Sequence, residues 1–463
     1  MLLRLRVTAR VGLALALSVA GVVACGGPRT SEVNAPSPTA VIVDTDGGAD
    51  DAIAVLYLLK NPAVRVRAIT VSGTGLVHCE QGVATMAGLV RLSGEGPLPI
   101  ACGRTTPLSG VRAFPADWRT QADHRYGGLL PTQGRPAGPD DAAELMSAVI
   151  ADAGSPMTVV TLGPLTNLAD ALNRHPTMAA QIARVVAMAG AFDVPGNVML
   201  PHRPRAAAAE WNLYVDPVAA QDVLSSGVPV RFAALDGQVP LDAYVARSLS
   251  SAAVTPAGKT VARLVESTPY FSSGTFFLWD PLAAAAATTP GEFVVHHRTA
   301  RVLTSGPEAG RVVTDRGRTV ETVSARDPDS FVADLTRVLN GGHGPSHLSR
   351  TPDVTVTMGQ GCQVSRASLA AGPRVVRLET PETAAALGVM LGEHSDAEIA
   401  SFLASDPTAP PPWFPLVALL QATRQPTDSF SVLAPAELTV VCVEGLARRP
   451  RFAGKTSLTV TVD

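Results

Sequence analysis

Four aspartates lie within eight residues near the beginning of the chain, in the segment Asp44-Thr45-Asp46-Gly47-Gly48-Ala49-Asp50-Asp51. Carboxylates gathered this closely in a folded site repel one another. A bound cation removes that repulsion, and carboxylate oxygens suit a hard ion such as Ca²⁺. The segment therefore predicts a metal site, with a solvated acidic turn as the simpler alternative.

The neighbouring sequence indicates where this cluster sits in the fold. The β-branched run at 39–44 predicts a buried strand, and the apolar residues of 51–60 follow a helical pattern. The glycines between them permit a tight turn, and carboxylates are favourable at a helix N-terminus. We expect the cluster at the carboxyl end of a strand, where α/β sheets bind their ligands.

Strand and helix patterns continue to alternate as far as residue 340. Further strands are predicted at 64–71, 156–162, 185–189 and 228–235, with a helix at 165–172. Alternation of this kind predicts an α/β domain at 39–340, built on a mainly parallel sheet flanked by helices.

The pattern changes after a linker rich in Gly, Pro and Ser at 341–353. Short β runs separated by turns fill 354–463, which predicts an all-β sandwich. This part is similar to a small cupredoxin domain, but no histidine follows Cys442 to complete a blue-copper site. We therefore expect no copper there.

The first residues predict export. Arg4 and Arg6 precede an apolar run, and together they are typical of a secretory signal peptide at 1–24. Small residues before Cys25 resemble a bacterial lipobox, which implies lipidation of Cys25 and anchoring to the outer face of the bacterial cytoplasmic membrane. Residues 25–38 then read as a flexible tether. A plain signal peptide with a chance cysteine is the alternative.

Four cysteines remain in the mature chain, which fits disulfides in an exported protein. Their spacing favours Cys79 with Cys102 and Cys362 with Cys442, although four cysteines allow three pairings. The net charge is −3 and no basic face stands out, so a nucleic-acid partner is not expected.

Two enzyme families carry an acidic segment of this kind after a strand. Asp44-x-Asp46-Gly47 resembles the haloacid-dehalogenase phosphatases, but the lysine and the second acidic pair of those enzymes have no convincing match. The full DxDxGxDD pattern resembles the signature of the inosine/uridine-preferring nucleoside hydrolases, with Gly47 where that family usually has proline. Four later segments are similar to the same family in the same order: LGPLTN at 162–167, MAGA with GN at 188–197, EWN with DP at 210–217 and WDPLA at 279–283.

The resemblance implies an enzyme that hydrolyses the N-glycosidic bond of ribonucleosides with Ca²⁺ as its cofactor. Asp46 matches the acid that binds the metal and acts as general base. Asp51, Asp280 and the backbone carbonyl of Leu162 match the other metal ligands.

The resemblance also assigns a sugar pocket. Asp50 matches the acid that binds the ribose 2′-hydroxyl. The other positions that match the sugar pocket are Met188, Asn197, Glu210, Trp211 and Asn212. Carboxylates near the ring would stabilise the positive charge of an oxocarbenium-like transition state.

Trp279 departs from the family, which usually has at this position a histidine that donates a proton to the leaving base. Trp279 could stack on the base instead. Tyr270, His124 and His78 are alternative donors, His124 through a weak likeness to a family HGxxGL segment, and Thr74 replaces a usual asparagine.

A rival hypothesis is a non-catalytic nucleoside-binding lipoprotein, and Trp279 and Thr74 are the residues that favour it. Both hypotheses imply a small-molecule nucleoside as the partner, and both leave homo-oligomer formation open.

Overall fold

The computed structural model describes residues 37–461, apart from 135–139, 269–270, 272–275, 360, 382–384, 405–415, 422–426, 433–434 and 445–450. The predicted signal peptide, Cys25 and Tyr270 therefore lie outside the described residues. Among the residues that are described, no helix is both long and apolar enough to cross a membrane.

An eight-stranded sheet organises the N-terminal part of the chain, in the order β3-β2-β1-β4-β5-β6-β8-β7. Its strands are β1 (Thr39–Thr45), β2 (Val64–Val71), β3 (Ile100–Cys102), β4 (Met157–Thr161), β5 (Ile182–Met188), β6 (Val230–Ala233), β7 (Phe293–Val302) and β8 (Val312–Ala325). All neighbours run parallel except β7 and β8. The expected mainly parallel α/β sheet is confirmed.

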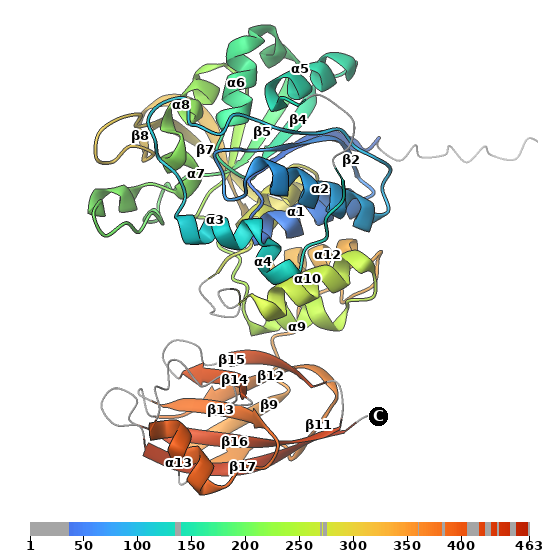
Figure 1. The fold of residues 1–463 in the computed structure, drawn as a ribbon, viewed down its shortest axis with the longest axis vertical. Helices are drawn as coiled ribbons and strands as arrows, with labels where there is room; N and C mark the ends of the chain where they lie inside the picture. The colour runs from blue at the N-terminus through green and yellow to red at the C-terminus, as the bar shows by residue number, and fades with distance from the viewer. Residues whose placement is uncertain are drawn as a thin grey trace, which may run out of the picture. The chain divides into compact units, whose positions relative to one another are not determined.

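Helices cover both faces of this sheet (Figure 1). One face packs against α1 (Ala49–Lys60), α2 (Cys79–Ser93), α9 (Ala243–Ser251), α10 (Pro256–Ser267), α11 (Trp279–Ala286) and α12 (Pro328–Leu339). The other face packs against α5 (Ala142–Asp152), α6 (Thr166–Arg174) and α8 (Pro217–Ser225). In β1, Val41 and Val43 belong to the first core and Ile42 to the second. Burial on both faces explains the continuous apolar run of residues 40–43 within this strand.

Shorter helical segments complete this part of the chain. They are α3 (Ala116–Asp123), α4 (Arg125–Gly128) and α7 (Trp211–Val215), with 3-10 turns at Pro176–Gln181, Pro204–Ala208 and Pro290–Glu292.

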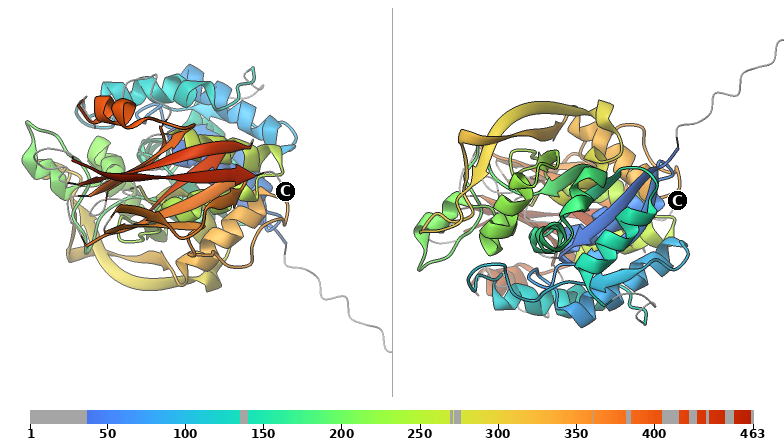
Figure 2. Two further views of the ribbon diagram at one scale, coloured as in Figure 1. Left: turned by 90° about the horizontal axis from the view of Figure 1, so that it is seen from below. Right: turned by 90° about the horizontal axis from the view of Figure 1, so that it is seen from above.

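The sequence did not predict the β7–β8 hairpin, which forms one edge of the sheet and curves away from it (Figure 2). Its strands carry exposed polar side chains, such as His297 and Arg316, in place of the apolar runs of the inner strands. Such side chains protect an edge strand from pairing with other chains. Because these side chains are polar, the two strands lack the continuous apolar run by which the inner strands were predicted.

The C-terminal part is mainly β and contains a four-stranded sheet, β10-β9-β12-β15, and a five-stranded sheet, β11-β17-β16-β13-β14, together with the helix α13, which was not predicted. Its elements are β9 (Val354–Gly359), β10 (Gly361–Val364), β11 (Ser368–Ala370), β12 (Gly372–Glu379), β13 (Ala386–Leu391), α13 (Asp396–Ala404), β14 (Leu416–Gln421), β15 (Thr427–Val432), β16 (Ala436–Glu444) and β17 (Arg451–Thr461). Side chains from both sheets, including Val356 and Val440, share one hydrophobic core. Figure 2 shows the two layers of strands in its left panel.

Both expected disulfides are present. Cys79 at the start of α2 is bonded to Cys102 at the end of β3. Cys362 in β10 is bonded to Cys442 in β16, so the second bond joins the two C-terminal sheets.

Candidate active site

The acidic turn connects the carboxyl end of β1 to the first residue of α1. Gly47 has a φ of +80°, and a Cβ there would lie 2.4 Å from Cγ1 of Val77. Proline cannot adopt this conformation because its ring fixes φ near −65°. The turn around Gly47 therefore has a conformation that the family's usual proline could not adopt.

Asp51 is the centre of the hydrogen bonds within this turn. Its Oδ1 accepts from Thr45 Oγ1 at 2.5 Å and from the Asp46 backbone N–H at 3.0 Å, and its Oδ2 accepts from the Gly48 N–H at 3.1 Å. Asp46 is held by a longer bond from the Gly48 N–H to its Oδ1, at 3.3 Å. These contacts fix the direction of two buried carboxylates at the end of a central strand.

A fourth aspartate reaches the turn from far along the sequence. Asp280 lies in the first turn of α11, which packs against α1. One carboxylate oxygen from each of Asp50, Asp51 and Asp280 lies within 4.8 Å of the other two. Asp280 Oδ1 is buried and has no hydrogen-bond partner. The folded chain therefore brings Asp280, which only the family resemblance had linked to the cluster, close to Asp50 and Asp51.

The surroundings of these acids favour their protonated forms in the absence of a cation. Burial raises the pKa of Asp46 well above its usual range, and the charges of Asp51 and Asp50 add to that effect. Burial and the charges of Asp50 and Asp51 do the same to the pKa of Asp280. Burial followed by the charge of Asp51 raises the pKa of Asp50 to about 7. A divalent cation would reverse this preference by balancing the negative charge.

The predicted sugar-binding residues line the same cavity as the acids. Glu210 caps α7, and its carboxylate accepts hydrogen bonds from the backbone N–H groups of Gly190, Asn212 and Leu213. Burial raises the pKa of Glu210 to about 7 even though these bonds lower it. Asn197 Oδ1 accepts from the Trp211 N–H at 3.1 Å.

Asn212 connects the sugar side of the cavity to the strands beneath it. Its side-chain amide donates to the carbonyl of Leu162 at 3.1 Å and to the carbonyl of Met188 at 2.9 Å. A carbonyl oxygen has two lone pairs, so this bond leaves one at Leu162 available to a cation.

The cavity measures about 440 Å³. Most of the aromatic residues that line it were not predicted from the sequence. Trp211 and Trp279 line it as expected. The lining residues that the sequence did not single out are Leu76, Phe114, Trp118, Gln121, Tyr126 and Phe276. Phe114 stacks on Trp211 with ring centroids 5.3 Å apart, and Trp118 meets Trp211 edge-on at 5.3 Å. Trp118 lies in the short helix α3, which the sequence did not predict, and no motif marked this residue.

The three alternative proton donors do not gain support from the structure. His78 pairs with Asp123 at 2.7 Å and is more than half exposed. His78 and His124 are absent from the described lining of the cavity, and Tyr270 lies outside the described residues. Thr74 is buried and bonds to the hydroxyls of Ser72 and Thr166.

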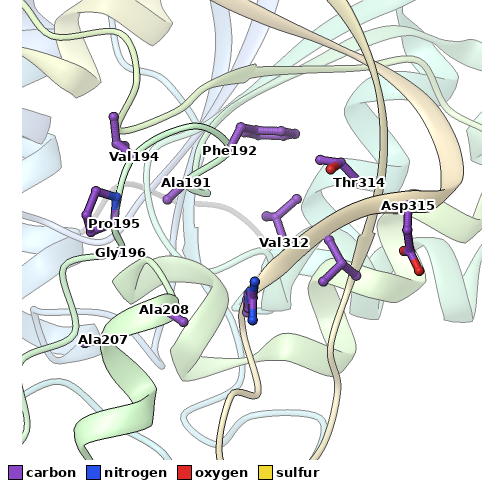
Figure 3. Close-up of a pocket in the computed structure, with 12 residues that line it drawn as sticks. Ala191, Phe192, Val194, Pro195, Gly196, Ala207, Ala208, Val312, Thr314 and Asp315 are labelled. Carbon is purple, nitrogen blue, oxygen red and sulfur yellow. The ribbon is translucent and has the colours of Figure 1, made fainter.

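A second cleft of about 680 Å³ lies between β8 and the segment 191–208 (Figure 3). Small or apolar residues such as Ala191, Pro195 and Val312 form most of its described lining, and Asp315 is the acid among them. None of the residues predicted for the site lies in it. The acid-lined cavity is therefore the candidate active site.

A family model for inosine-uridine preferring nucleoside hydrolases matches residues 41–338. This chain belongs to that family. The pyrimidine-specific ribonucleoside hydrolase RihA of Salmonella agona (strain SL483) is 38% identical over 196 residues, which cover 42% of this chain and 60% of RihA. This chain thus spans somewhat less than two thirds of the length of the curated relative.

Solved structures of nucleoside hydrolases share the fold. The inosine-uridine preferring enzyme of Bacillus anthracis has a TM-score of 0.58 at 24% identity, covering 65% of this chain and 99% of its own. A plant nucleoside hydrolase has a TM-score of 0.57 at 26% identity, with the same coverage. The C-terminal sheets of this family member lie beyond the residues that the family model matches.

Proposed function

We propose that this protein hydrolyses the N-glycosidic bond of ribonucleosides, giving ribose and a free base. The observation that carries the proposal is the convergence of Asp46, Asp50, Asp51 and Asp280 in one cavity with Asn197, Glu210 and Asn212. Acids on one side and sugar-binding groups beside them suit a reaction in which positive charge develops on a ribosyl ring. Membership of the nucleoside hydrolase family supports the same reaction.

Ca²⁺ is the proposed cofactor, with Asp46, Asp51, Asp280 and the Leu162 carbonyl as its ligands. The donor set fits the ion, since it consists of oxygen atoms alone and one of them, Asp280 Oδ1, is buried without a partner. Bound Ca²⁺ would lower the pKa of water and offset the charge of the carboxylates. Asp50, which also lies within the cluster, is assigned to the ribose 2′-hydroxyl.

The protein's own groups then have distinct roles. Asp46 takes the proton of the attacking water as general base. Asp50, Asn197 and Asn212 orient the ribose, and the Glu210 carboxylate lies near the charge that develops on the ring. The Trp211 and Trp279 rings enclose the sugar and base, which excludes water from the bond that breaks.

Ribose release from a panel of nucleosides tests this proposal, with the chain from residue 39 onward and added Ca²⁺. Asp46→Asn should lower kcat by roughly 10²–10⁴-fold, the usual contribution of a general base. The rival function, a nucleoside-binding lipoprotein, predicts binding by calorimetry without ribose release from any nucleoside. A phosphatase would instead release phosphate, require Mg²⁺ and lose activity in Asp44→Asn.

The proposal includes a location. Lipidation of Cys25 would anchor the enzyme to the outer face of the bacterial cytoplasmic membrane, where it would act on nucleosides outside the cell. The two disulfides fit an oxidising compartment of this kind.

A further inference from the structure

The charged side chains in the described lining of the candidate active site are acidic. Asp46, Asp50, Asp51, Glu210 and Asp280 contribute five carboxylates. Among the described residues of the lining there is no lysine, arginine or histidine. One divalent cation would balance two of the five charges, so a cavity with all five ionised would keep a negative excess. Such a cavity disfavours a substrate that carries phosphate and favours one that carries positive charge.

Six aromatic rings line other parts of the cavity. They are Phe114, Trp118, Tyr126, Trp211, Phe276 and Trp279. Tryptophan faces attract cations through the ring quadrupole more strongly than other aromatic side chains do, and the attraction is strongest in desolvated sites. Aromatic cages are a common way of binding flat or compact organic cations. The walls and the acids therefore favour the same kind of ligand.

The chemistry of the leaving group also favours a cationic substrate. A neutral base leaves more easily if an acid protonates it. Tyr126 is the phenol in the described lining, and its hydroxyl donates to the Gly47 carbonyl at 3.2 Å. The Glu210 carboxylate accepts three backbone hydrogen bonds, so it is held as an acceptor. A leaving group that already carries a positive charge needs no acid.

We propose that the preferred substrates are N-ribosylpyridinium compounds, in which a cationic aromatic ring is joined to C1′ of ribose through its nitrogen. The inference rests on the proposed hydrolase function and names its substrate class. A cationic ring suits both the aromatic walls and the negative excess, and it leaves without a proton, whereas a neutral nucleobase leaves more easily when an acid protonates it.

The reaction balances with water alone. The water oxygen bonds to C1′ as the C1′–N bond breaks. The electron pair of that bond passes to the ring nitrogen, which becomes neutral and leaves as a pyridine. Asp46 takes the proton of the water and releases it to solvent, so the products are ribose, a pyridine and a proton.

The first measurement isolates charge from shape. Binding of N-ribosylpyridinium and of its neutral isostere, C-ribosylbenzene, is compared by calorimetry in Asp46→Asn protein with Ca²⁺. The cation should bind about 10-fold more tightly or better, as expected for cation–π contacts in a desolvated site. Equal affinity for the two compounds would overturn the proposal.

Turnover gives the second measurement, with kcat/KM for N-ribosylpyridinium, uridine and inosine. The cation should be the best substrate after division by each uncatalysed rate. Trp118→Leu should lower kcat/KM for the cation about 10-fold, whereas Val111→Ala, at a residue that is 95% exposed, should not. Trp279→His should shift preference toward inosine, because it adds an acid and removes a ring.

The outcomes separate the two proposals. A kcat/KM for uridine or inosine that exceeds that for the cation, after division by each uncatalysed rate, would overturn the substrate class and leave the hydrolase function standing. If no riboside is hydrolysed, the hydrolase function fails and the substrate proposal fails with it. A preference for the cation in the binding experiment would then indicate a binding protein for cationic ribosides.

Discussion

Asp44, Asp50 and Glu210 are buried carboxyl groups, and burial is the largest cause that raises the pKa of each to about 7. Their usual pKa values are 3.8 for the aspartates and 4.5 for the glutamate. Between these values and about 7 the folded protein holds more protons than the unfolded chain, so its stability falls as pH rises.

We expect the Tm of Ca²⁺-free protein to fall between pH 5 and 8 by something on the order of 5 °C. Differential scanning calorimetry in chelator measures the fall. Added Ca²⁺ should reduce the slope, because the ion offsets the charge at Asp50. A Tm that rises with pH in chelator would contradict the assignment of these groups.

Thr45 is a positioning residue for the proposed metal site, through its hydroxyl bond to Asp51 at 2.5 Å. Thr45→Val removes the bond and keeps the shape of the side chain. We expect weaker Ca²⁺ binding by roughly 10–100-fold, the usual effect of losing a bond that orients a metal ligand. Titration with Ca²⁺ provides the measurement. Thr45→Ser restores the hydroxyl and should restore affinity, and an unchanged Kd in Thr45→Val would refute this role.

At the scale of elements, α4 is a turn in which four consecutive residues have positive φ, namely Arg125, Tyr126, Gly127 and Gly128. Its Tyr126 contributes to the cavity and bonds to the acidic turn through Gly47. The left-handed conformation costs a non-glycine residue roughly 1–2 kcal/mol. Glycine at position 127 avoids this additional backbone strain next to Tyr126.

Gly127→Ala should lower stability by about 1 kcal/mol through backbone strain, because a Cβ at this position would meet no other atom within 4 Å. It should also lower kcat/KM by disturbing Tyr126. Gly96→Ala is the matched control, since that position is equally open but lacks positive φ. Denaturant unfolding and initial rates measure both effects, and identical behaviour of the two variants would rule out the proposed strain.

The elements around the acidic turn could be predicted from the sequence, because β1 contains the apolar run of residues 40–43 and the acidic segment begins directly after that run. The approach of Asp280 to Asp50 and Asp51 could be predicted only through family resemblance, since Asp280 lies 229 positions after Asp51 in the sequence. The ring of Trp118 was not predicted, because its short and mostly polar helix α3 carries little apolar periodicity. The strands of the β7–β8 hairpin were also not predicted, because their exposed polar residues interrupt any apolar run.

At the scale of the whole molecule, each disulfide stabilises a different part of the chain. The Cys79–Cys102 bond joins α2 to the edge of the α/β sheet, beside the turns that form the cavity, and Cys362–Cys442 joins the two C-terminal sheets. Bonds of this kind typically contribute about 2–4 kcal/mol. They are stable in an oxidising compartment and scarce in the cytosol. The two disulfides therefore fit the proposed export and do not test the proposed lipid anchor.

Cys25→Ser tests whether a lipid on the cysteine retains it. If Cys25 is lipidated, the full-length wild-type protein should sediment with membranes and enter the detergent phase, because acyl chains buried in the bilayer contribute about 0.8 kcal/mol per CH₂. Cys25→Ser should abolish incorporation of radiolabelled palmitate and shift the protein out of the detergent phase. Its kcat/KM should match that of the wild type, because the substitution leaves the cavity intact. Asp46→Asn should give the opposite pattern, membrane-bound and inactive. Palmitate-free wild-type protein in the soluble fraction would mean that residues 1–24 serve as an ordinary signal peptide and that Cys25 stands at its end by chance.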